Sequence, residues 1–158
     1  MSRAPFQVLV IPFRLLGSGE LEYCILKRAD LDAWQWVAGG GHKGEVPHIT
    51  ARREAEEEVG LPFDSPLFKL DTKCSIPKSF FRGHQNWSPD LYVIPEYAFA
   101  VDCQDNQIEL CDEHTDLFWG DYKTVMTKLN WDSNKTALWE LQQRYSERKL
   151  FPNETSSR

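Results

Sequence analysis

The chain has 158 residues, 41% of them hydrophobic and 13% aromatic, which is enough for one core and excludes an intrinsically disordered protein. No apolar run approaches the roughly 20 residues of a membrane-spanning helix, and the first residues lack the features of a signal peptide, so we expect a cytoplasmic protein without a membrane partner. The net charge of −6, without a basic stripe, argues against long nucleic acid as a ligand, whereas a small polyphosphate is compatible because a bound divalent metal reverses the local field.

The first forty residues predict three strands. Residues 7–13 and 21–27 are apolar and contain β-branched side chains, and a turn at 17–20 joins them into a hairpin. Residues 33–38 predict a third strand, which runs into a glycine loop at 39–41.

A helix is predicted next, from Pro47 to Val59. Proline suits the first turn of a helix, where its missing N–H is no loss, and Gly60 suits the end. Val46 is a poor N-cap, so capping does not define the start of this helix.

The second half predicts strands over 68–76 and 93–101 and a short closing strand over 113–119. Between the first two lies a polar and aromatic loop over 77–91. A loop of this length in a compact domain is often functional.

A last helix is predicted to begin near residues 131–133, with Asp132 or Ser133 as its cap. Its apolar face consists of Ala137, Leu138, Leu141 and Tyr145. The order of elements predicts one domain over residues 1–150, with helices packed on a mixed sheet, followed by a polar, frayed tail over 151–158.

The cysteines are predicted to be reduced thiols, because they are widely spaced and form no C-x-x-C pair. They are Cys24, Cys74, Cys103 and Cys111. A zinc site built from Cys103, Cys111 and His114 is disfavoured, since the spacing matches no common site.

The residues that carry chemistry lie between positions 39 and 61. On the predicted helix, Glu54, Glu57 and Glu58 are three and four residues apart, so their carboxylates project from one face. Such a face is more often simply solvated, but like charges this close favour a hard cation with oxygen ligands, such as Mg²⁺. We expect the opposite face to be small and apolar and to pack on the sheet; it consists of Ala51, Ala55 and Val59.

Residues around the helix complete this pattern. Arg53 can orient a carboxylate through a forked hydrogen bond, and Glu45 can supply a further carboxylate or brace the preceding loop. The glycines allow close approach of the backbone, and a glycine carbonyl can join the coordination.

The segment resembles the Nudix box, with every fixed polar or glycine position filled at the family's spacing. Those positions are Gly39, Glu45, Arg53, Glu54, Glu57, Glu58 and Gly60. The departure is Ala55, where the family more often has a larger aliphatic residue. The resemblance implies an α/β/α sandwich with a mixed sheet and a Mg²⁺-dependent hydrolase, with Mn²⁺ as a substitute, that cleaves a nucleoside diphosphate linked to another moiety.

The resemblance also implies roles for individual residues. Glu54 and Glu58 are the expected metal ligands, with Glu57 beside them and the Gly39 carbonyl in addition. Arg53 would orient the carboxylates and Glu45 would secure the loop. An acid from outside the box often completes such a site, and Glu113 is the candidate, with a surface acid as the equal alternative. One carboxylate serves as general base, and the sequence does not identify it.

The flanking residues look most like the bacterial dATP or dihydroneopterin triphosphate pyrophosphohydrolase branch of the family. Lys27 and Arg28 could meet phosphates. Aromatic residues could stack on a purine or pterin ring, with core packing as the alternative, which is favoured for Trp34, Trp36 and Trp131. The candidates are Trp34, Trp36, Phe80, Phe81 and Trp87.

Several functions remain open from the sequence. The first is release of pyrophosphate from a nucleoside or pterin triphosphate; alternatives are hydrolysis of ADP-ribose or a dinucleotide, and a module that senses nucleotides without cutting them. A polynucleotide-processing role is disfavoured by the missing basic surface. A homodimer agrees with what is common in the family, although nothing in the sequence selects an interface.

Overall fold

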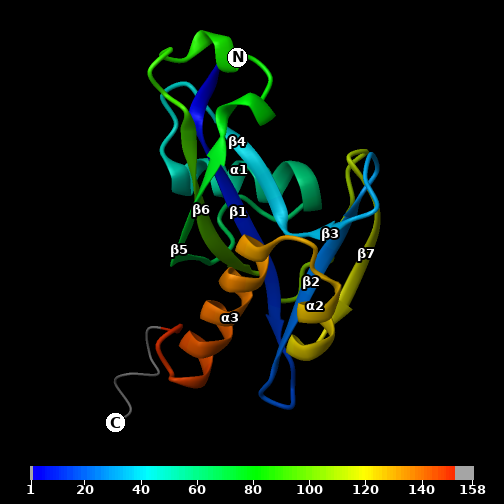
Figure 1. Cartoon of the computed structure of the whole chain (residues 1–158). Coiled ribbons are helices and arrows are strands. Elements are labelled where there is room, and N and C mark those ends of the chain that lie inside the picture. Colours follow the sequence, from blue (N-terminus) through cyan, green and yellow to red (C-terminus); the bar gives the residue numbers. More distant parts are fainter. Residues whose placement is uncertain (1, 152–158) are drawn as a thin grey trace.

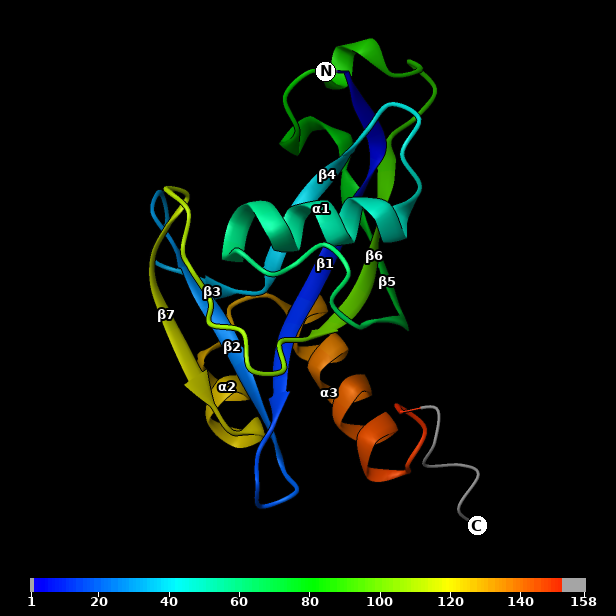
Figure 2. The same cartoon turned by 180° about the vertical axis from the view of Figure 1, so that it is seen from behind.

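The computed structural model describes residues 2–151, and within them a seven-stranded mixed sheet lies between one helix on one face and two on the other (Figures 1 and 2). The chain forms β1 (Arg3–Leu15), β2 (Leu21–Arg28), β3 (Trp34–Gln35), β4 (Val37–His42), α1 (Pro47–Val59), β5 (Leu67–Pro77), β6 (Val93–Asp102), β7 (His114–Gly120), α2 (Tyr122–Lys128) and α3 (Asp132–Ser146). This arrangement confirms the predicted sandwich.

The sheet is organised around β1, which pairs with three other strands. It runs parallel to β6, with Gln7 opposite Glu96. On its other side it runs antiparallel to β4 through its N-terminal half and to β2 through its C-terminal end. The sheet therefore divides on that side of β1.

Side chains alternate along the strands and build two cores. On one face Leu9, Ile11 and Phe13 pack with the apolar side of α3 and with Val125 of α2. On the other face Val8 and Val10 pack beneath α1. All four cysteines are free thiols, and no helix of residues 2–151 is long and apolar enough to cross a membrane.

The helix α1 begins and ends where the sequence predicts. Gly60 adopts the left-handed conformation with φ 72°, and its N–H donates to the Glu56 carbonyl, which closes the helix. The apolar stripe lies beside the glutamates, however, and not opposite them. Ala51 and Glu58 are about two turns apart and so lie on nearly the same side, and both are buried.

Two predictions around β4 were wrong. The strand predicted over 33–38 is interrupted at Trp36, whose backbone N–H donates to Asn134 Oδ1 at 3.0 Å instead of to a neighbouring strand. The glycines at 39–41 form strand β4 rather than a loop, and the turn follows at Gly44, with φ +88°.

Three further differences concern the second half of the chain. The helix α2 was not predicted; it is short and is capped by Asp121, whose side chain accepts from the Thr124 N–H at 2.9 Å. The cap of α3 is Trp131, without a side-chain bond, instead of Asp132 or Ser133. Phe151 packs against Phe13 and Phe68 and is not frayed, whereas 152–158 lie outside the described residues.

Candidate active site

Two glutamates of α1 form the most unusual feature of the molecule. Glu58 is 3% exposed, and its Oε2 has no hydrogen-bond partner within residues 2–151. Burial, and next the neighbouring Glu54 carboxylate, raise the pKa of Glu58 far above its usual range. A buried carboxylate oxygen without a partner is costly, so the geometry fits a group that supplies positive charge. A hard divalent cation, which prefers carboxylate oxygens, is such a group.

Arg53 and Glu45 form a clamp that holds the start of α1 to β4. Arg53 donates from Nε to Glu45 Oε2 at 2.8 Å and from Nη2 to the Gly40 carbonyl at 2.9 Å. Glu45 also accepts from the His42 N–H and the Thr50 hydroxyl. These bonds, that of Arg53 first, lower the pKa of Glu45 to about 2. Glu45 therefore braces the turn in this structure.

The other side of Arg53 positions two more carboxylates. Its Nη1 donates to Glu54 Oε1 at 2.9 Å and to Glu57 Oε2 at 3.1 Å. Glu57 remains 55% exposed. Within residues 2–151 no three His, Cys, Asp or Glu side chains already form a metal-binding group. Glu54 interacts directly with Glu58, whereas Glu57 is bonded to Arg53 at the exposed edge of the helix.

Gly39 has a steric role that the sequence did not reveal. A Cβ at this position would lie 2.1 Å from Cδ of Glu54. The bare backbone of β4 is thus what allows the Glu54 carboxylate to lie against the strand.

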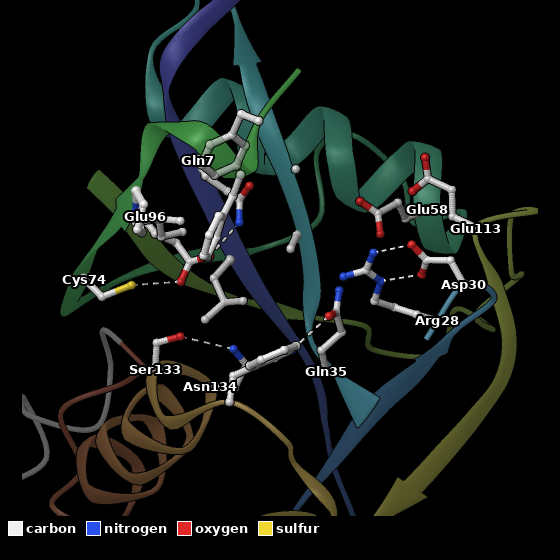
Figure 3. Close-up of a pocket in the computed structure, with 18 of the residues that line it drawn as sticks. Gln7, Arg28, Asp30, Gln35, Glu58, Cys74, Glu96, Glu113, Ser133 and Asn134 are labelled. Carbon is white, nitrogen blue, oxygen red and sulfur yellow. Dashed lines mark hydrogen bonds and ion pairs between the residues drawn. The ribbon is translucent and has the colours of Figure 1, made fainter. Parts of the chain in front are cut away.

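A cleft of about 880 Å³ opens beside these residues (Figure 3). Its acidic end contains Glu58 and Glu113, next to Arg28, which is held by Asp30 through bonds of 2.7 and 2.5 Å. A smaller hollow of about 330 Å³ shares Gly39 and Glu113 with the cleft and extends along α1. That hollow is lined by Arg53, Glu54 and Glu57, among others.

The predicted substrate-contacting residues divide into two groups. Arg28 and Phe81 line the cleft. Lys27, Trp34 and Trp87 do not: Lys27 pairs with Asp32 at 2.9 Å, Trp34 packs against Phe118, and Trp87 donates to the Arg3 carbonyl.

The remaining aromatic candidates are also divided. Trp36 is fully buried in the core, as favoured from the sequence. Phe80 lines the cleft, and so does Trp131, for which core packing was favoured. Trp131 is 41% exposed and its Nε1 donates to Gln35 at 3.2 Å, so that preference was wrong.

Sequence reasoning missed His114 as a neighbour of the glutamates. His114 is buried, and its Nε2 lies 3.6 Å from Glu58 Oε1. Burial lowers the pKa of His114, which favours the neutral ring. Its place directly after Glu113 was the available signal.

The sequence also gave no role to the polar floor at the far end of the cleft, which consists of Gln7, Cys74 and Glu96. A weak signal was present. Gln7 is two residues from Leu9, and Glu96 is two residues from Ala98, so both polar side chains share a face of the sheet with apolar core residues.

Comparisons with known proteins agree with this geometry. The model of the NUDIX domain matches residues 8–139. A solved structure of a NUDIX hydrolase from Listeria monocytogenes is 40% identical with a TM-score of 0.85, over 93% of this chain and 98% of that one. Dihydroneopterin triphosphate diphosphatase of Haemophilus influenzae is 28% identical, over 71% of this chain and 72% of that protein. An RNA pyrophosphohydrolase of Roseobacter denitrificans is 26% identical, over 74% and 76%.

Proposed function

Because the chain belongs to the Nudix family and is a hydrolase of phosphorus anhydrides, we propose that it cleaves a nucleoside triphosphate or dihydroneopterin triphosphate to the monophosphate and pyrophosphate, with Mg²⁺ as cofactor. The observation that carries this proposal is the buried, unpartnered oxygen of Glu58 beside Glu54, at the acidic end of a cleft large enough for a nucleotide.

The proposed metal ligands are Glu54 and Glu58, together with the Gly39 carbonyl and with Glu57 and Glu113 from the rim. Bound Mg²⁺ would lower the pKa of a water and neutralise charge on the phosphates, and Mn²⁺ could replace it. Arg53, fixed by Glu45, would hold the Glu54 carboxylate in place, because it already donates to that group at 2.9 Å.

The shape of the site supports separate positions for the phosphates and for the ring system of the substrate. The smaller hollow along α1 would take the phosphates next to the carboxylates, and the larger cleft would take the ring system. Arg28 lines the larger cleft beside Glu58 and Glu113 and would contact a phosphate, and Phe81 offers an aromatic face to the ring.

Other activities compete with this proposal. The relative named RNA pyrophosphohydrolase makes a triphosphorylated RNA end the second candidate, although the net charge of −6 disfavours a long polyanion. A sensor without activity is disfavoured by the complete set of carboxylates. We also propose that residues 1–150 form a single catalytic domain.

The test is a Mg²⁺-dependent release assay over a panel of dNTPs, dihydroneopterin triphosphate, ADP-ribose, a diadenosine polyphosphate and 5′-triphosphorylated RNA. Glu58→Gln should lose at least about 100-fold in kcat while the fold is retained. Glu56→Gln is the matched control, because Glu56 is exposed on the same helix, outside both hollows, and should keep full turnover.

Two outcomes would contradict the proposal. Full turnover by Glu58→Gln would remove this residue from the metal site. Tight nucleotide binding without turnover of any substrate by the wild type would favour the sensor.

A further inference from the structure

The far end of the cleft contains a buried carboxylate that the proposed chemistry does not use. Glu96 is 6% exposed and lines the cleft from β6. Figure 3 shows it with Gln7 and Cys74 on one side of β4, whereas Glu58, Glu113 and Arg28 lie on the other. Glu96 is therefore placed to meet the part of a substrate that is remote from the phosphates.

The sheet register fixes this group. Glu96 is directly opposite Gln7 in β1 and Cys74 in β5, so the three side chains share one face of three adjacent strands. Deeper along β1 and β6, the same face carries Leu9 and Ala98, which belong to the core under α3. The polar group thus begins where that core ends and the cleft opens.

The hydrogen bonds of Glu96 do not use all the acceptor capacity of its carboxylate. Gln7 Nε2 donates to Oε2 at 2.8 Å, and Cys74 Sγ donates to Oε1 at 3.3 Å. A carboxylate offers about four lone-pair sites, so each oxygen can accept once more. No lysine, arginine or histidine of residues 2–151 forms an ion pair with Glu96. Its natural complement is a pair of N–H donors.

We propose that Glu96 determines ring specificity by accepting two adjacent N–H donors from the 2-amino-4-oxopyrimidine edge that guanine and pterin share. This edge presents a ring N–H beside an exocyclic amino group, which matches the two oxygens of one carboxylate. Adenine and cytosine present an amino group beside an unprotonated ring nitrogen, whose lone pair would face the buried charge. Hypoxanthine retains the ring N–H but lacks the amino group, so one oxygen would lose its donor.

The inference rests on the proposed function, because it assumes a nucleotide-like substrate with its phosphates at Glu58. It adds that substrates with a guanine or pterin ring are preferred over dATP. The two sources of this edge are distinguished by kcat/KM of the wild type for dGTP and for dihydroneopterin triphosphate; dependence on Glu96 is expected for both.

The experiment measures binding separately from turnover. Calorimetry of the wild type with dGMP, dIMP and dAMP should give a dGMP affinity about 10- to 100-fold higher than the other two, the range expected of a bidentate contact. In Glu96→Gln this preference should vanish. Its kcat/KM should fall by a similar factor for dGTP and dihydroneopterin triphosphate, and by less than about threefold for dATP. Glu56→Gln, the same chemical change at an exposed position outside both hollows, is the control and should behave as the wild type.

Each failure has a distinct signature. Equal affinity of the wild type for the three monophosphates would overturn the inference without any variant. An equal loss for every ring in Glu96→Gln would make the residue structural and would also overturn it. Selective binding of dGMP by a protein that hydrolyses no triphosphate would leave the ring contact in place and refute the proposed function instead.

Discussion

Replacement of Gly39 by alanine should lower the catalytic activity while the stability of the fold changes little. The new Cβ would lie 2.1 Å from Cδ of Glu54, whereas two carbon atoms need about 3.5 Å, so the carboxyl group has to move by about 1.4 Å. Misplacement of a reacting group by about 1 Å can cost roughly 100-fold in rate. The backbone at Gly39 is not left-handed, so alanine is tolerated there, and we expect a stability change within about 1 kcal/mol.

The measurement compares kcat, the Mg²⁺ concentration for half-maximal activity and Tm. Gly17→Ala adds a methyl group with no atom within 4 Å and should match the wild type in all three. Gly41→Ala also adds a methyl group to β4, but this group would clash with the Phe6 ring instead of Glu54. This variant should therefore lower Tm more than it affects the Mg²⁺ requirement. Wild-type kcat in Gly39→Ala, or a loss explained by unfolding alone, would refute the steric argument.

Three other outcomes follow from the site. Mg²⁺ at about 100 times its dissociation constant should stabilise the wild type by about 2.7 kcal/mol in thermal unfolding, and an equal gain in Glu58→Gln would contradict the proposed ligand set. The pKa of Glu45 is lowered by Arg53 from 4.5 to about 2, so its contribution, about 1–3 kcal/mol, is present above pH 4.5 and is lost as the pH falls toward 2. Acid unfolding should therefore show wild type and Glu45→Gln converging at low pH, and a constant gap would be inconsistent with this pairing. Arg28→Ala should raise KM roughly 10-fold, whereas Lys27→Ala, outside the cleft, should leave it unchanged; similar kinetics for both would argue against phosphate contact.

Local sequence signals were sufficient to predict the elements that are bounded by proline, glycine or a turn. Pro47 and Gly60 bracket α1, and the turn before Leu21 defines the first hairpin, because these residues act through their own backbone preferences. The same reliance on backbone preference led to the wrong prediction of a loop for the glycines of β4. Glycine permits a loop, but here it makes room for side chains from other elements, and only the assembled sheet shows that.

The cleft was the least predictable part. Arg28 and Lys27 are adjacent in sequence and similar in chemistry, yet strand alternation places only Arg28 at the cleft. Core packing was the favoured alternative for Trp131, although this residue borders the cleft instead. Gln7 and Glu96 are 89 positions apart, so no local pattern could bring them together.

The parallel pairing of β1 with β6 also has a consequence for how the protein is made. During translation the glutamate helix leaves the ribosome well before residues 93–102, which must later align beside β1. Until then one edge of β1 is unpaired, and an open edge invites association with other nascent chains. The hydrolase can thus become functional only after its C-terminal half has emerged, and the interval before that is when the chain is most exposed to aggregation.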